Sequence, residues 1–356
     1  MENKKYKVLV VGCGGMGGPH AKAYHKLNEF EIVGIVTLNP KKHKDLAIEL
    51  GESINWYTDF YNALEKTKPD IVSINTYPDT HADFVRKSFE AGAHVFVEKP
   101  LATTVKDAEE LVALALQKNK KLLVGYILRV HPAWSKFIQI AKTLGKPLVM
   151  RMNLNQQSSG KEWLTHKIFM KSISPLVDCG VHYVDVMCQM TGSNPVRVSA
   201  IGANLSHEID KRMYNYGQLQ VTFEDGSVGW YEAGWGPMMS ETAFFIKDVI
   251  GPKGCVSIED QKEVDSQDIE GHTKTGSLRL HHSALDVQGN FVKKDELIDT
   301  SSEPNHEELC ELEQRLLLKA IKEDLDLSDH MQDAVNSLKI VLAADESIRT
   351  GKVVNL

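Results

Sequence analysis

The feature that most constrains the fold of this chain is a glycine-rich turn close to its first residue. Residues 12–17 read Gly-Cys-Gly-Gly-Met-Gly. They follow directly on a predicted buried strand at residues 7–11, whose residues 8–11 are all apolar. Residues 20–27, after the turn, are predicted to form a helix. A strand, a G-x-G-x-x-G turn and a helix in this order indicate the first unit of a parallel α/β sheet.

The missing side chains of this turn also indicate a ligand. Without Cβ atoms, the backbone turns tightly and approaches a pyrophosphate, whose charge meets the free amides and the positive end of the helix dipole. We therefore predict that a dinucleotide binds here, and the alternative is a glycine-rich turn that binds nothing. The predicted contacts are Gly12, Gly14, Gly15, Met16 and Gly17.

The first third of the sequence alternates between strand and helix patterns. Strands are predicted at residues 31–36, 71–75, 94–97 and 122–126, and helices at residues 41–50, 80–91 and 104–119. Such alternation with short connections predicts a doubly wound parallel sheet that is covered on both faces. We place this dinucleotide-binding Rossmann domain at residues 1–127.

After about residue 128 the pattern becomes that of an antiparallel sheet. The predicted strands are residues 146–155, 197–203, 217–223, 228–233, 244–250 and 255–259. The predicted helices are residues 175–190, 307–323 and 330–349, and residues 261–300 indicate only irregular strands and loops. The predicted fold class is thus α/β, with a second, α+β domain at residues 128–356 for substrate binding and oligomerisation. This domain has a large, mostly antiparallel open sheet. Its last helix packs either on this sheet or, as an alternative, back on the first domain.

Composition narrows the class of protein. The 356 residues are 42% hydrophobic and 25% charged, as in ordinary globular proteins. Lys and Arg number 41 against 48 Asp and Glu, and no basic block stands out, which argues against nucleic acid as the main partner. No apolar run approaches the ~20 residues of a membrane span, and the run at residues 8–11 is too short for an export signal. Five cysteines without a C-x-x-C pair indicate neither a disulfide framework nor a zinc cluster, so we expect a cytoplasmic protein.

The end of the second predicted strand bears on the choice of cofactor. An acidic residue for the adenosine ribose is expected ~20 residues past the glycines, where this chain has Thr37. A threonine lacks the carboxylate that accepts both ribose hydroxyls and repels a 2′-phosphate. Lys41, Lys42 and Lys44 follow, so the sequence slightly favours NADP over NAD. The alternative is that these lysines form the solvated face of a helix.

Glu98-Lys99-Pro100 follows the fourth predicted strand, at the sheet edge where ligands bind in such folds. The Lys99 ammonium is suited to hydrogen-bond a substrate hydroxyl and to stabilise the alkoxide that develops as hydride leaves. The alternative is a surface salt bridge with Glu98. Pro100 favours a cis peptide bond that directs Lys99 inward.

The predicted helix at residues 175–190 carries a third constellation. Spacings of four and three place Asp178, His182 and Asp185 on one face of this helix. A histidine beside carboxylates is suited to remove a hydroxyl proton during hydride transfer, and a buried histidine with satisfied hydrogen bonds is the alternative. Metal binding is disfavoured because no further His or Cys ligand is spaced to complete a site.

Five motifs now stand in order along the chain: the glycine turn with His20, Asn75-Thr76-Tyr77-Pro78 with His81, Glu98-Lys99-Pro100, Arg129-Val130-His131-Pro132, and Asp178 to Asp185. In this order they resemble the Gfo/Idh/MocA oxidoreductases, which include inositol dehydrogenase and glucose-fructose oxidoreductase, over essentially the whole chain. The resemblance implies a dinucleotide domain and an α+β domain whose open sheet is often used for oligomerisation.

The resemblance also implies roles for individual residues. Lys99, Asp178 and His182 are implied as the working residues at the substrate, with His182 as the acid/base. Further implied dinucleotide contacts are Thr37, Asn75, Thr76, His81 and Glu98. Thr37 departs from the acidic residue that many members have at this position.

Three further side chains are candidates for substrate contact. Trp163 follows Ser158-Ser159-Gly160 and is placed to stack on a sugar ring or simply to pack. Tyr126 and Arg129 stand where the chain leaves the first domain, and they either line a cleft or hold the junction.

These observations predict an NAD(P)-dependent oxidoreductase that moves hydride between a nicotinamide and a secondary alcohol of a sugar, cyclitol or sugar derivative. One alternative is redox-neutral elimination or hydrolysis of a glycoside with bound NAD, and another is a dinucleotide-binding regulator without chemistry. An exposed sheet face in the second domain favours a homodimer or homotetramer.

Overall fold

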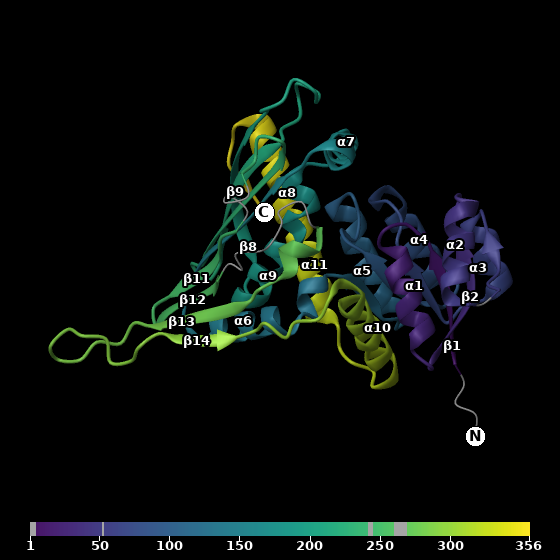
Figure 1. Ribbon diagram of the computed structural model, residues 1–356, viewed down its shortest axis with the longest axis horizontal. Helices are drawn as coiled ribbons and strands as arrows, with labels where there is room; N and C mark the ends of the chain where they lie inside the picture. The colour runs from purple at the N-terminus through teal and green to yellow at the C-terminus, as the bar shows by residue number, and fades with distance from the viewer. Residues whose placement is uncertain (1–4, 52, 241–244, 260–268) are drawn as a thin grey trace. The chain divides into compact units, whose positions relative to one another are not determined.

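The structure, a computed structural model, describes residues 5–51, 53–240, 245–259 and 269–356. It divides into two compact units, each built from two stretches of chain (Figure 1). The first unit comprises Met1–Val130 and Asn305–Val335, and the second comprises His131–Pro304 and Asn336–Leu356. In the described part of the chain, no helix combines the length and the apolar character that crossing a membrane requires.

A six-stranded sheet forms the centre of the first unit, with the strand order β3-β2-β1-β4-β5-β6 and parallel pairing throughout. This doubly wound order reverses between β1 and β4, and ligands bind at such a reversal, outside the carboxyl ends of the strands. The strands are β1 (Tyr6–Val11), β2 (Phe30–Val36), β3 (Trp56–Tyr57), β4 (Ile71–Ile74), β5 (His94–Glu98) and β6 (Leu122–Gly125).

Helices follow the strands of this sheet in turn. β4 and β6 are buried along their whole length, which explains their continuous apolar sequences. Polar residues cap several helices, as where Asn39 accepts from the first amides of α2 and Thr104 accepts from the Asp107 amide of α5. The helices are α1 (Gly17–Lys26), α2 (Pro40–Leu50), α3 (Phe60–Thr67), α4 (Pro78–Glu90), α5 (Val105–Lys118) and α10 (His306–Lys322), with the short η1 (Ile127–Arg129) after β6.

The second unit contains a nine-stranded sheet with the order β14-β13-β12-β11-β7-β10-β9-β8-β15. All its neighbouring strands are antiparallel except β7 and β10, which run parallel. The strands are β7 (Val149–Gln157), β8 (Pro195–Ala203), β9 (Tyr216–Phe223), β10 (Val228–Gly236), β11 (Lys247–Gly251), β12 (Gly254–Glu259), β13 (Ser277–His282), β14 (Glu296–Asp299) and β15 (Val354–Asn355).

Helices cover one face of this sheet. α6 packs on β11 and β12, and α8 and α9 pack on β10, where Tyr183 of α9 stacks on Tyr231 with ring centroids 5.2 Å apart. Side chains alternate between the two faces of a strand, so the neighbouring Trp230 projects to the opposite face and is half-buried. The helices are α6 (Pro132–Thr143), α7 (Gly160–Phe169), α8 (Pro175–Asp178), α9 (Gly180–Thr191), η3 (Ile269–Thr273) and α11 (Ser328–Thr350), of which the first part of α11 belongs to the first unit.

The predicted fold class is confirmed, and the two sheets have the expected pairing. Sequence patterns missed α3, α6 and α7, and the single helix predicted at residues 175–190 is wrong, because the chain breaks into α8 and α9 at Cys179. A Cβ on Gly180 would lie 3.0 Å from the Tyr231 ring, so the glycine allows α9 to begin close to the sheet. Residue 244 of one predicted strand and residues 261–268 of the irregular segment lie outside the described residues.

The division of the chain differs from the predicted boundary between residues 127 and 128. Residues 305–335 join the first unit because α10 packs against α1. Its Leu317 and Leu318 belong to the same apolar core as Val8 and Val10 of β1. Local periodicity predicted α10 as a helix but carried no signal for the distant partner on which it packs.

Candidate active site

The glycine turn is held by two contacts that leave no room for side chains. Gly12 has a φ of +88°, and a Cβ there would lie 2.5 Å from the carbonyl oxygen of Asn75. A Cβ on Gly17 would lie 2.0 Å from the carbonyl oxygen of Gly12. These two glycines are therefore required by the packing of the turn against the end of β4 and against itself.

Gly14 and Gly15 differ from them, because their missing side chains leave open space. A Cβ on Gly15 would meet nothing within 4 Å, and one on Gly14 would meet only the Lys42 ammonium, at 3.8 Å. Met16, at the N-cap of α1, makes no side-chain cap, and the first turn of α1 carries no acidic residue. The open glycines, the uncapped helix end and the nearby ammonium fit the pyrophosphate of a dinucleotide.

Thr37 lies after the end of β2, where an acidic residue was expected. Its Oγ1 accepts from the Asn39 amide at 3.2 Å, and its carbonyl accepts from the Trp56 indole at 2.9 Å. Residues 37–44 contain no carboxylate. The hydroxyl of Thr37 thus shapes the connection into α2, and its contact with a ribose stays a prediction.

The connection from β4 to α4 holds three more of the predicted dinucleotide contacts. The Asn75 amide donates to the Val11 carbonyl at 2.8 Å and ties the ends of β4 and β1 together. Thr76 and Thr80 share a hydroxyl hydrogen bond of 2.6 Å. His81 is fully buried, with Nδ1 2.8 Å from the Pro100 carbonyl and Nε2 3.1 Å from the Thr76 carbonyl. Burial lowers the pKa of His81, and the contacts of its two ring nitrogens join the two connections.

Glu98 ends β5 with its carboxylate turned into the protein. Its Oε1 accepts from Nε2 of His20 at 2.9 Å, and its Oε2 lies 3.3 Å from the Lys99 amide. The Lys99–Pro100 peptide bond is cis, as predicted. Lys99 therefore begins the loop at the carboxyl edge of the parallel sheet, the same edge at which β1 delivers the glycine turn.

The second unit positions Asp178 and His182 on either side of the break between α8 and α9. Ser174 caps α8 by accepting from the Val177 amide at 3.1 Å, and His182 is 8% exposed in the first turn of α9. Asp178 ends α8 and His182 lies in α9, so the two residues belong to successive helices and not to the single helix that was predicted. Asp185 is buried and accepts from Gln189 at 3.0 Å.

Beside these residues lies a cluster that sequence patterns did not reveal. His166 of α7 stacks on Trp235 with ring centroids 4.4 Å apart, and its Nδ1 lies 3.0 Å from the Ser158 hydroxyl. Gln156 accepts from the Trp235 indole at 3.0 Å. Burial lowers the pKa of His166 to about 4 against an opposing effect of Asp178, so its imidazole is neutral at pH 7. Sequence patterns did not predict α7, the helix that holds His166, because Ser158-Ser159-Gly160 is typical of a loop.

A second imidazole approaches the predicted acid/base residue. The rings of His272 and His182 lie 5.8 Å apart, and the Tyr183 hydroxyl is 3.4 Å from Nδ1 of His272. His272 belongs to η3, inside the stretch that sequence patterns left irregular.

The three additional substrate candidates are largely engaged in packing. Trp163 is 6% exposed and donates to Glu208 at 3.1 Å. Tyr126 is buried, and Arg129 forms an ion pair of 2.8 Å with Asp333 at the start of α11. Substrate contact by these residues stays a prediction.

One group among the described residues has the side chains of a metal site, namely His20, Cys310 and Glu313. Both ring nitrogens of His20 have protein partners, Glu98 and Gln314. Burial and the Glu98 charge raise the pKa of Glu313 well above its usual value. A protonated carboxyl is a poor metal ligand, so this group fits a metal ion badly.

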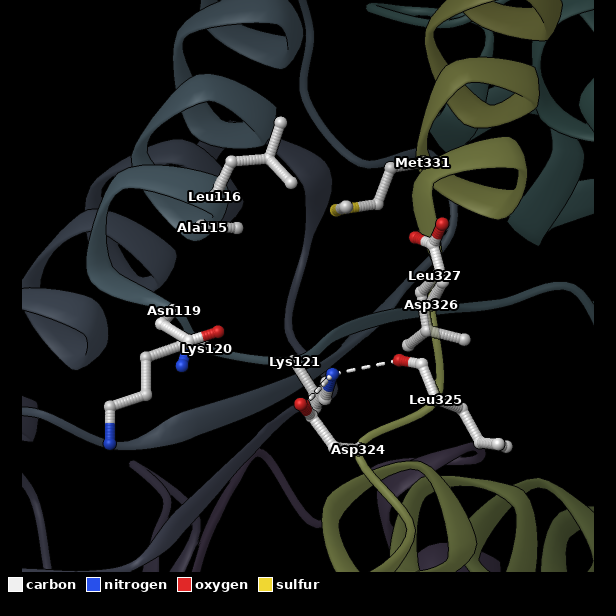
Figure 2. A pocket seen from close by; sticks show the side chains of 10 residues that line it. All are labelled: Ala115, Leu116, Asn119, Lys120, Lys121, Asp324, Leu325, Asp326, Leu327 and Met331. Carbon is white, nitrogen blue, oxygen red and sulfur yellow. Dashed lines mark hydrogen bonds and ion pairs between the residues drawn. The ribbon is translucent and has the colours of Figure 1, made fainter.

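A cavity of about 230 Å³ opens elsewhere in the first unit, between α5 and the link from α10 to α11 (Figure 2). Lys121 lines this cavity, and its ammonium donates to the Leu325 carbonyl at 2.7 Å and pairs with Asp324 at 2.6 Å. None of the predicted site residues lines this cavity.

A doubly wound sheet, an open glycine turn before α1 and a lysine at the carboxyl edge of β5 together define a dinucleotide-dependent enzyme. Two family models match the chain. One, described as an oxidoreductase family with an NAD-binding Rossmann fold, matches residues 6–126, and the Gfo/Idh/MocA C-terminal domain model matches residues 138–255. The protein belongs to the Gfo/Idh/MocA family of oxidoreductases, which confirms the resemblance noted from its motifs.

Individual relatives extend this finding. The chain is 26% identical over 364 residues to scyllo-inositol 2-dehydrogenase (NAD(+)) of Bacillus subtilis, covering 98% of this chain and 96% of that protein. It is 28% identical over 193 residues to UDP-N-acetylglucosamine 3-dehydrogenase of Acidithiobacillus ferrooxidans, covering 54% of this chain and 56% of that protein. The fold matches scyllo-inositol dehydrogenase of Lactobacillus casei, solved with NAD(H) and scyllo-inositol, with a TM-score of 0.79, 21% identity and 99% of each chain covered.

The two kinds of glycine in the turn give a paired prediction. Gly15→Asp places a negative side chain in the open cradle, so we expect parental thermal stability but at least about tenfold weaker dinucleotide binding from charge repulsion. Gly17→Ala drives its Cβ into the Gly12 carbonyl, so we expect a melting temperature several degrees lower. Thermal unfolding with and without NAD measures both effects. Parental NAD affinity in a folded Gly15→Asp protein would contradict this site.

Proposed function

We propose that the protein is a dehydrogenase that moves hydride between NAD and a secondary alcohol of a cyclitol, sugar or sugar derivative. The observation that carries the proposal is the open cradle at Gly14 and Gly15, on the same sheet edge as Lys99. The substrate class is supported by relatives named for dehydrogenation of scyllo-inositol and of a nucleotide sugar.

Each working residue has a part in this proposal. When bound, the nicotinamide ring exchanges hydride with the substrate carbon. His182 takes the proton that leaves the hydroxyl, Asp178 orients substrate or imidazole, and the Lys99 ammonium hydrogen-bonds the oxygen as negative charge develops on it. Holding the reactants at contact distance supplies roughly 7–11 kcal/mol, and acid/base help adds ~10²–10⁴-fold.

NAD is the cofactor that we propose, because the family model and the inositol dehydrogenases support it and the NADP preference predicted from Thr37 gains no support. Lys42 beside Gly14 suits the pyrophosphate that both cofactors share. Thr37 then shapes the loop into α2, with no role in excluding a 2′-phosphate.

The two units divide these tasks. We assign dinucleotide binding to the first unit, and substrate binding and oligomerisation to the second. We propose that a homodimer or homotetramer forms through the sheet face that carries the half-buried Trp230. Trp230 lies there between Arg151 of β7 and Gln220 of β9, and Arg151 pairs with Asp248 at 2.8 Å. All five cysteines are free, which supports a cytoplasmic location that cell fractionation would test.

The catalytic assignment predicts the effect of two substitutions. Lys99→Met removes the ammonium and His182→Ala removes the proton acceptor, so each lowers turnover by at least about a hundredfold while NAD binding survives. Lys118→Met, a substitution of the same kind in the last turn of α5, serves as the control with parental turnover. Either site variant turning over like the parent would remove that residue from the mechanism.

A substrate panel tests the reaction itself. Cyclitols, aldoses and sugar acids are incubated with NAD or NADP, and absorbance of the reduced nicotinamide is followed. We expect reduction of NAD with at least one cyclitol or sugar, and kcat/KM at least about tenfold higher with NAD than with NADP. Substrate consumption without reduced nicotinamide would indicate redox-neutral chemistry. Binding without any turnover would indicate a regulator.

The open face predicts the effect of a charge on assembly. Trp230→Glu should shift the protein toward monomer in sedimentation velocity, because a desolvated carboxylate disfavours a buried interface. Leu116→Glu, on the exposed side of α5, is the matched control and should keep the parental assembly. An unchanged oligomer for Trp230→Glu would exclude this face as the interface.

A further inference from the structure

Glu98, the residue before Lys99, belongs to a buried cluster of polar side chains that has no part in the proposed reaction. It joins Glu98 on β5, His20 on α1, and Glu313 and Gln314 on α10, all less than about a tenth exposed. His20 stands at its centre, with Nε2 2.9 Å from Glu98 and 4.0 Å from Glu313. The Gln314 amide donates to Nδ1 of His20 at 3.0 Å, so the ring carries its proton on Nε2 and donates it to Glu98.

The two buried carboxyl groups beside His20 differ in how readily they ionise. Burial opposes the charge on Glu98, but His20, Lys99 and His81 outweigh it and lower the pKa of Glu98. Burial, reinforced by the Glu98 charge, raises the pKa of Glu313 well above its usual value. These opposite shifts favour a negative charge on Glu98 over one on Glu313.

The position of this charge is fixed on both sides. Oε1 of Glu98 is held by His20, and Oε2 faces the Lys99 amide at 3.3 Å. A Cβ on Gly125 of β6 would lie 3.2 Å from Oε1, so the neighbouring strand also confines the carboxylate. Both oxygens of Glu98 therefore have protein partners, His20 and the Lys99 amide.

We propose that Glu98 is a positioning residue for the hydride transfer, because its buried carboxylate is fixed by His20 and holds Lys99 through the Lys99 amide. This inference rests on the proposed function, because it assigns Glu98 a task through Lys99. It replaces the dinucleotide contact that the family resemblance implied for Glu98. α10 thereby contributes to the site through His20 rather than by touching substrate.

The two carboxyl groups allow a matched test, since Glu98→Gln removes a charge and Glu313→Gln replaces one neutral group by another. We expect Glu98→Gln to lower kcat at least about tenfold, with KM for NAD changed less than about threefold. The alkaline limb of the kcat profile should move about one pH unit lower, because Lys99 loses its proton more easily without a nearby negative charge. Glu313→Gln should leave all three quantities within about twofold of the parent.

Glu98→Asp keeps the negative charge, but the shorter side chain places the carboxylate farther from His20. We expect it to lower kcat while the alkaline limb stays in place, and it carries the test if Glu98→Gln does not fold. Parental kcat in either Glu98 variant would overturn the inference, as would equal losses in Glu98→Gln and Glu313→Gln. If a Glu98 variant raised KM for NAD and left kcat unchanged, Glu98 would instead contribute to dinucleotide binding. Lys99→Met with parental turnover would instead overturn the proposed function.

Discussion

The first unit depends on one close approach of backbone to backbone. Gly17 lies against the Gly12 carbonyl so tightly that no side chain fits between them, and Gly12 lies equally close to Asn75. These contacts fix where α1 begins, and they leave Gly14 and Gly15 facing open space. The same constraint that closes the turn therefore creates the cradle for a pyrophosphate.

The placement of α1 has consequences farther along the sheet. Because α1 begins at this turn, His20 on its first turn reaches Glu98 at the end of β5, and Glu98 precedes Lys99. α10 supplies Gln314 to the other side of His20 across 294 residues of sequence. The glycine turn and Lys99, for which we propose dinucleotide binding and catalysis, are thus connected through α1 and the buried hydrogen bonds of His20 and Glu98.

In the second unit, the predicted catalytic residues lie at the junction between two helices. Gly180 allows α9 to begin close to the Tyr231 ring, and Asp178 and His182 come from two successive helices, α8 and α9. The stacked pair of His166 and Trp235 and the buried Gln156 lie close to this break. Polar groups with few rotational choices are suited to hold a hydroxylated ring in a fixed orientation.

Sequence patterns predicted the elements whose signal is local. The continuous apolar strands β4 and β6, the glycine turn and the capped helices α2 and α5 were all evident, as was the class of the second sheet. α7 was missed because Ser158-Ser159-Gly160 is typical of a loop, and the break at Cys179 was missed because helical spacing continues through it. The partnership of His20 with Glu98, Glu313 and Gln314 depends on contacts between distant segments, which no periodicity encodes.

The most direct test of the account is a crystal structure of the protein with NAD and an inositol bound. The account predicts the pyrophosphate on the amides of Gly14 and Gly15, and one substrate hydroxyl within about 2.6–3.2 Å of both the Lys99 ammonium and a ring nitrogen of His182. A pyrophosphate away from the glycine turn would contradict it. So would an inositol whose reacting hydroxyl touches neither of these side chains.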